Sequence, residues 1–134
     1  MTAAEALAAL LSLFAHVLHS DCIARRREEI VADADAAARD HHVPVALLLA
    51  VGFAESHLGC APRSGGCWGA PRDRDHRASA GRADHAASAL ALGHRRCATW
   101  PGAIAHFRCG ACRCSGSYPQ RVHSLWQRVE EVSR

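Results

Sequence analysis

Glu55 is the residue whose position most clearly suggests chemistry. It ends the most apolar stretch of the chain, which includes Leu47, Val51 and Phe53, and Ser56 follows it directly. Apolar surroundings favour the neutral form of a carboxyl group, and a carboxyl group that keeps its proton near neutral pH can act as a general acid. The residue type alone also allows a side chain that points into solvent or pairs with a nearby arginine. Both interpretations are open at this point.

The chain contains seven cysteines in 134 residues. Such a count indicates metal binding in a reducing cytosol and disulfides in an exported protein. Cys60 and Cys67 enclose a short loop that a disulfide easily closes, and we predict this bridge. Cys22 is far in sequence from every other cysteine and is expected to remain unpaired. Cys97 ends a predicted helix and is expected to reach one of the cysteines between residues 109 and 114; the other pairings stay open.

Zinc is the alternative for this cluster of cysteines. The spacing His106-x2-Cys109-x2-Cys112-x-Cys114 has the short intervals of zinc ligands. It lacks two separated Cys-x2-Cys pairs, and Cys112 and Cys114 would crowd a tetrahedral ion, so we favour disulfides. The ten histidines show no ligand motif. We therefore assign no metal ligand and expect no cofactor.

The composition limits the class of protein. A hydrophobic content of 49% with 22% charged residues is typical of a globular chain and excludes a disordered or fibrous one. All 16 basic residues are arginine, and neither lysine nor asparagine occurs. This bias is weak support for a nucleic-acid partner, and we expect none. The formal net charge of +3 would favour approach to a polyanion such as a cell-wall polymer.

Helical spacing of apolar residues dominates the chain, and no alternating run of strand length is present. The fold is therefore predicted to be all-α with little or no strand. Pro44 separates the first two helices, because the residue before a proline resists the helical conformation. The predicted helices cover Ala24–His41, Val45–His57, Ala83–Cys97, Pro101–Phe107 and a final amphipathic segment containing Val122 and Val129. Leu58–Arg82 and Arg108–Ser117 are predicted to be ordered loops.

Residues 1–23 allow two interpretations. The stretch Leu7–Leu18 is apolar enough for the core of a signal peptide, but Met1–Ala24 has no basic residue and no small-x-small site precedes Cys22. A signal-like segment and an amphipathic helix are both open, and the globular domain is expected to cover residues 24–134. No segment is apolar over the length that a membrane-spanning helix requires.

Four motifs in order resemble a known family. Val43–Arg72 contains Glu55-Ser56 at the end of a proline-started apolar helix, followed by Ser64, Gly66 and Gly69 in a loop. The segments AIAHFRCG, from Ala103, and YPQRV, from Tyr118, follow. This arrangement is similar to that of the soluble lytic transglycosylases of the lysozyme-like superfamily.

The resemblance implies a lysozyme-like helical domain with a disulfide-tied cleft loop. It also implies that Glu55 alone cleaves the bond between N-acetylmuramic acid and N-acetylglucosamine and leaves 1,6-anhydro ends. Hydrolysis would instead need a second carboxylate about 5–9.5 Å away. Asp73, Asp75 and Asp84 are candidates for it, but they are more simply explained as solvated charges. The expected substrate-binding residues are Ser56, Ser64, Trp68, Gly69, Arg72, Phe107, Arg108 and Tyr118.

The resemblance also implies roles for individual substrate-binding residues. Trp68 and Tyr118 are expected to stack on the glycan, with packing in the core an equally open alternative for Trp68. Arg72 replaces the family's Gln, and Phe107-Arg108 replaces its Tyr-Asn pair. Both arginines are expected to contact muramic lactyl or peptide carboxylates.

The resemblance also implies a setting and a partner. We expect a monomer in the periplasm or outside the cell that acts on peptidoglycan glycan strands. A catalytically degenerate peptidoglycan-binding module is the first alternative, because the family's Gln and its Tyr-Asn pair are replaced. A zinc-stabilised interaction domain is the second.

Overall fold

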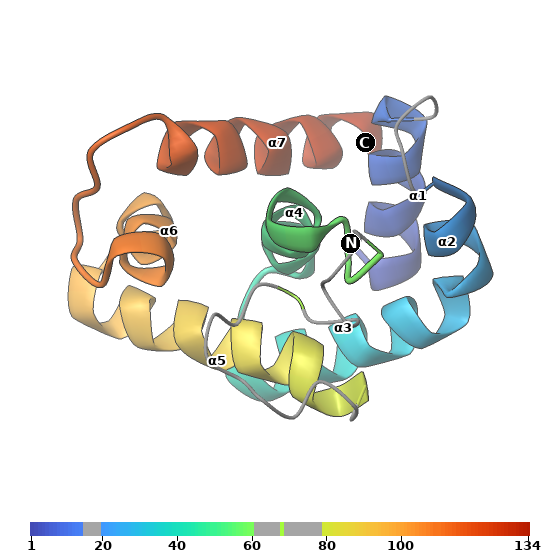
Figure 1. The fold of residues 1–134 in the computed structure, drawn as a ribbon, viewed down its shortest axis with the longest axis horizontal. Coiled ribbons are helices and arrows are strands. Elements are labelled where there is room, and N and C mark those ends of the chain that lie inside the picture. The colour runs from blue at the N-terminus through green and yellow to red at the C-terminus, as the bar shows by residue number, and fades with distance from the viewer. Residues whose placement is uncertain (15–19, 61–67, 69–78) are drawn as a thin grey trace.

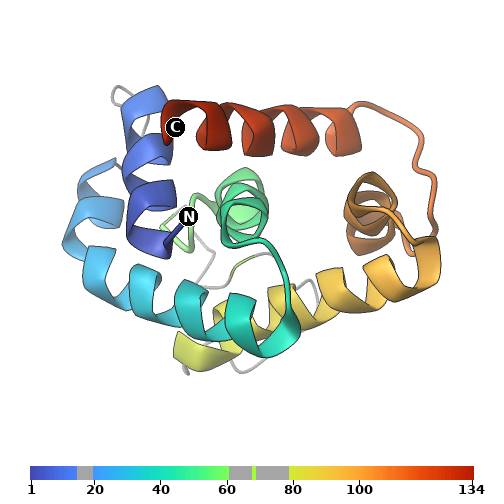
Figure 2. The same cartoon turned by 180° about the vertical axis from the view of Figure 1, so that it is seen from behind.

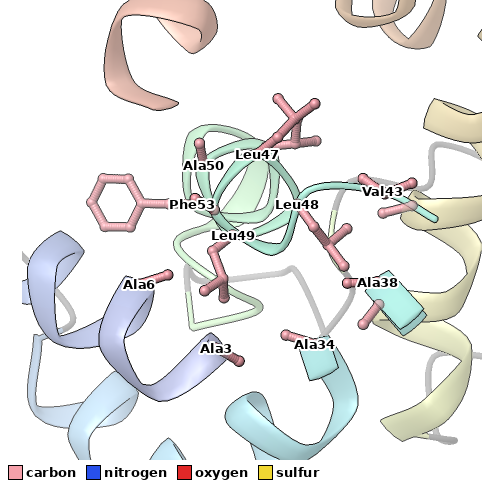
Figure 3. Packing of buried hydrophobic residues seen from close by; sticks show 14 of the residues in the cluster. Ala3, Ala6, Ala34, Ala38, Val43, Leu47, Leu48, Leu49, Ala50 and Phe53 are labelled. Atoms are coloured by element: carbon pink, nitrogen blue, oxygen red, sulfur yellow. The ribbon is translucent and has the colours of Figure 1, made fainter. Parts of the chain in front are cut away.

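The helix α4, Val45–Ser56, lies at the centre of the molecule. In the computed structural model, which describes residues 1–14, 20–60, 68 and 79–134, nine of its twelve residues are buried. A helix that is apolar on all sides has to be enclosed by other elements. Figure 3 shows side chains of α4 leaving the helix axis in different directions, with Phe53 and Leu47 on opposite sides.

Four helices enclose α4. They are α1 (Ala3–Leu13), α3 (Arg27–His41), α5 (Ser79–Cys97) and α7 (Tyr118–Val132), and α6 (Trp100–Cys109) packs against α5 and α7. In Figures 1 and 2, α7 crosses one side of α4, while α3 and α5 run along the opposite side. The described residues form helices and no strand, which confirms the predicted all-α class.

The N-terminal helix α1 shares the core with the rest of the chain. Thr2 caps it in a reciprocal pair with Glu5, in which each side chain accepts from the other residue's backbone N–H. Ala3, Leu7 and Leu10 are fully buried, and α1 packs against α3, α4 and α7. The described part of residues 1–23 is thus helical and integrated into the fold. No helix among the described residues has the length and apolar character needed to cross a bilayer.

The predicted helix Ala24–His41 is interrupted at Arg26. The chain instead forms α2, Ser20–Arg25, and α3, which begins at Arg27. The Arg26 guanidinium pairs with Glu29 at 3.2 Å and donates a hydrogen bond of 3.2 Å to the carbonyl oxygen of Leu58. Arg26 therefore connects the α2–α3 junction to the segment that follows α4.

Three disulfides link Cys22 to Cys60, Cys97 to Cys112 and Cys109 to Cys114. The predictions that Cys60 pairs with Cys67 and that Cys22 is unpaired are therefore wrong. Helix α2 brings Cys22 beside the turn after α4, so a separation of 38 residues in sequence becomes a direct contact. Cys67 lies outside the described residues.

The expectation that Cys97 reaches the cysteine cluster is confirmed by its bond to Cys112. Cys109 and Cys114 are also oxidised to a disulfide. Zinc is ligated by thiolates, which these paired sulfurs no longer provide. Disulfides thus account for the cysteine cluster in place of zinc.

Candidate functional site

Glu55 lies in the last turn of α4, where the chain makes a tight left-handed turn. His57 and Leu58 have φ angles of 48° and 58°, and the backbone N–H of Leu58 donates to the carbonyl of Gly52 at 3.0 Å. This bond folds the residues that follow the helix back against its last turn. The chain therefore leaves the helix abruptly, two residues after Glu55.

Ser56 stabilises this turn from inside. Its side chain is buried, its hydroxyl donates to the carbonyl of Gly52 at 3.4 Å, and it accepts a bond of 2.9 Å from the N–H of Gly59. A hydroxyl engaged in this way holds the helix end in position. Ser56 therefore bonds to residues of its own chain, whereas the resemblance implies that it contacts the substrate.

The Glu55 side chain is 12% exposed and is contacted through both of its oxygens. The phenol of Tyr118 donates a hydrogen bond of 2.8 Å to Oε1, and Nη1 of Arg108 lies 3.6 Å from Oε2. The guanidinium carbon of Arg108 is also 5.2 Å from the centre of the Tyr118 ring, in cation–π geometry. The three side chains form one cluster, which we call the Glu55 cluster.

The state of Tyr118 follows from its surroundings. Burial raises the pKa of its phenol well above the ordinary value of 10.0, and the hydrogen bond to Glu55 and the charge of that carboxylate raise it further. The charges of Arg108 and Arg121 oppose this shift. The phenol therefore keeps its proton and acts as a hydrogen-bond donor to Glu55 throughout the neutral range.

The cysteine-rich loop positions two members of the Glu55 cluster. Arg108 is the penultimate residue of α6 and Tyr118 is the first residue of α7. Gly110 ends α6 with a φ of 75°, which glycine adopts without steric cost. The disulfide from Cys109 to Cys114 closes the loop immediately beside Arg108. This covalent link shortens the path between the two residues and limits how far they can separate.

Trp68 lies in the core. Its side chain is 1% exposed and packs directly onto α4, where a Cβ added at Gly52 would lie 2.7 Å from its Cε3 atom. The core-packing alternative is thus the one observed, and the buried ring does not offer a face to a sugar. Phe107 is partly buried against the same core.

Of the remaining predicted residues, Asp84 lies in the described part of the chain and the others do not. Asp84 is about half exposed and pairs with Nε2 of His41 at 2.7 Å, which agrees with a solvated charge rather than a partner of Glu55. Among the residues that the structure describes, no group of three or more His, Cys, Asp and Glu side chains could hold a metal ion. The other predicted site residues lie outside the described ranges: Ser64, Gly69, Arg72, Asp73 and Asp75.

The sequence left open that Glu55 pairs with an arginine, and the structure shows this pair with Arg108. The hydrogen bond from Tyr118 to Glu55 was missed. Tyr118 was expected to stack on substrate, and Arg108 was expected to bind substrate carboxylates. The resemblance offered a signal for Arg108 alone, because it aligns Phe107-Arg108 with a pair whose tyrosine is expected near Glu55. No protein-family model, curated protein or solved structure matches this chain.

Proposed function

We propose that this protein is a peptidoglycan lytic transglycosylase in which Glu55 is the single acid/base. The observation that supports it best is the Glu55 cluster, in which a largely buried carboxyl group at the end of the central helix receives a hydrogen bond from Tyr118. A carboxyl group whose Oε1 is held by a donor keeps a fixed orientation, and its other oxygen, Oε2, would be the one to exchange a proton with the substrate. General acid catalysis needs such a geometry.

The reaction requires two proton transfers at Glu55. The carboxyl group first protonates the oxygen that bridges N-acetylmuramic acid and N-acetylglucosamine, and the bond from this oxygen to the muramic C1 breaks. The carboxylate then removes the proton of the muramic 6-hydroxyl, whose oxygen forms a new bond to C1. The substrate supplies its own nucleophile, so the second carboxylate of a hydrolase is not needed.

Arg108 and Tyr118 would have different roles in this sequence. Tyr118 holds Oε1 during both steps, because its phenol stays protonated. Arg108 approaches Oε2, but its side chain is 56% exposed and is free to turn outward. An anionic group of the bound substrate would attract the guanidinium away from Oε2, the oxygen that has to exchange a proton. Substrate binding would thus release Glu55 for catalysis.

The second candidate is a peptidoglycan-binding module without turnover. It is favoured by the same contact of 3.6 Å, because an arginine that stays beside Oε2 occupies the oxygen that has to exchange a proton. The two candidates differ in what Arg108→Gln does. A displaceable arginine predicts weaker substrate binding in the variant, whereas a permanent ion pair predicts that cleavage appears only when Arg108 is removed.

The cellular setting belongs to the same proposal. Three disulfides form and persist in an oxidising compartment. Peptidoglycan lies in such a compartment, in the periplasm or outside the cell. We therefore place the protein in the cell envelope, acting as a monomer on glycan strands.

The test is digestion of purified sacculi by the wild type, Glu55→Gln and the matched control Glu131→Gln, which changes an exposed glutamate of α7. Mass spectrometry of the released muropeptides should show 1,6-anhydro ends, about 18 Da (one water) lighter than hydrolytic products. Glu55→Gln should release none, and Glu131→Gln should match the wild type. Reducing ends would indicate a second carboxylate, with Asp73 or Asp75 the first to replace. Binding to sacculi without release would support the binding module.

A further inference from the structure

A pocket of about 520 Å³ lies beside the Glu55 cluster, between α4, α7 and the end of α1. Figure 1 shows α7 crossing α4 and reaching the end of α1. Tyr118 lines this pocket and also donates its hydrogen bond to Glu55. The adjacent residue Ala54 is part of the wall as well. The pocket therefore shares a wall with the carboxyl group that we propose to be catalytic.

The floor of the pocket is apolar and its rim is basic. Phe14 and Phe53, whose ring centres are 4.8 Å apart, and Leu125 provide the apolar surface. Arg121 and Arg128 are exposed on α7 and are the charged residues among the described ones that line it. Within the described part of the chain, neither guanidinium pairs with a carboxylate. The pocket thus presents two unneutralised positive charges over an apolar surface.

The spacing on α7 explains this arrangement. Tyr118, Arg121, Leu125 and Arg128 follow one another at intervals of three, four and three residues, which places them on one face of the helix. The two arginines are therefore about two turns apart along one edge of the pocket. This separation suits a ligand with two carboxylates in an extended chain better than a single compact anion.

We infer that this pocket binds the peptide stem of peptidoglycan. The inference rests on the proposed function and names the part of the substrate that a second subsite would recognise. The stem leaves the lactyl group of the muramic acid next to the bond that is cleaved, and it combines alanine methyl groups with free carboxylates. Methyl groups match the apolar floor, and the carboxylates match Arg121 and Arg128.

The binding test uses the full chain and the peptide N-acetyl-L-Ala-γ-D-Glu-L-Ala, with NMR titration as the readout. Wild type should bind it with shifts at Leu125 and its neighbours. The double variant Arg121→Gln/Arg128→Gln should bind about tenfold or more weakly, and the peptide with both carboxylates amidated should lose a similar factor against wild type. The control Arg95→Gln/Arg134→Gln, which removes two exposed arginines elsewhere, should bind like wild type.

A cleavage test separates this inference from the proposed function. Wild type should cleave peptide-bearing glycan at least tenfold faster than glycan stripped of peptides by an amidase, and the double variant should lose this preference while still cleaving stripped glycan. Cleavage without peptide binding, or peptide binding unchanged in the double variant, overturns the inference and leaves the proposed function intact. Peptide binding without any cleavage of sacculi supports the inference and overturns the catalytic role.

Discussion

The phenol oxygen of Tyr118 lies 2.8 Å from Oε1 of Glu55, although 63 positions separate the two residues in sequence. The bond joins the first residue of α7 to the last turn of α4. It makes the orientation of Glu55 depend on where α7 begins, and hence on the disulfide-closed loop before it.

The first prediction concerns the titration of Tyr118, which is the single tyrosine of the chain. Because its pKa is raised in the folded protein, phenolate absorbance should develop only well above pH 10.0 in the native state and near pH 10.0 in denaturant. The neutral phenol should therefore stabilise the fold fully below about pH 10, and this contribution should be lost as the pH rises further. Tyr118→Phe should lack this alkaline loss. Native titration near pH 10 would contradict the burial of the phenol.

The second prediction is that Tyr118→Phe slows glycan cleavage about 10- to 100-fold, the effect of losing one hydrogen bond to a charged group. The ring still fills its place, so the fold should be retained. The matched control is Trp126→Phe on the same helix, which removes a hydrogen bond of 2.8 Å to Glu130 and should leave cleavage unchanged. Muropeptide release rates measure the effect, and circular dichroism reports folding. An unchanged rate in Tyr118→Phe would show that this bond does not position Glu55 for reaction.

The sequence was sufficient for most of the helices, but not for the break at Arg26 or for the contacts between helices. The apolar run of α4 and the proline before it predict a buried central helix, because burial of nearly every side chain leaves a local pattern. The pairing of Cys22 with Cys60 leaves none, because it depends on how α2 packs beside the turn after α4.

The contact of Trp68 with Gly52 could be predicted from the sequence only in part. A glycine inside an apolar helix indicates that another group approaches closely, but it does not identify that group. The bond from Tyr118 to Glu55 is set by the positions of two helix ends in space. For the same reason, the roles expected of Ser56 and Trp68 could be assigned only once the fold was known.

The third prediction concerns the disulfide between Cys22 and Cys60, which joins cysteines 38 positions apart in sequence. Replacing both cysteines by serine should lower the free energy of unfolding by about 4 kcal/mol on a chain-entropy estimate. Urea unfolding measures the loss. The comparison is the removal of Cys109 and Cys114, which are only five positions apart in sequence and whose removal should cost less.

Non-reducing peptide mapping checks the pairing itself. Three disulfides use six of the seven cysteines, so one thiol per chain should be alkylated in denaturant, at Cys67. A peptide linking Cys60 to Cys67 would show that this connectivity is wrong.

The fourth prediction concerns Gly52, in the interior of α4. On helix propensity alone, Gly52→Ala should stabilise the protein by up to about 1 kcal/mol. The added Cβ, however, would lie 2.7 Å from Cε3 of Trp68 and 2.9 Å from Cδ2 of Leu58, and both of these side chains are buried and have no room to move away. Overpacking of this kind costs about 1–3 kcal/mol, so the net effect should be a loss of stability, measured by urea unfolding.

Gly52→Ala should also reduce cleavage, because Leu58 belongs to the turn that follows Glu55 and its N–H bonds to the carbonyl of Gly52. Trp68→Phe removes the ring atom that clashes with the new methyl group. The double variant should therefore cost less than the sum of the two single variants, and this difference measures the contact directly. Equal or greater stability of Gly52→Ala would mean that Trp68 does not pack against α4 in solution, and the turn after Glu55 would then lack the support of this contact.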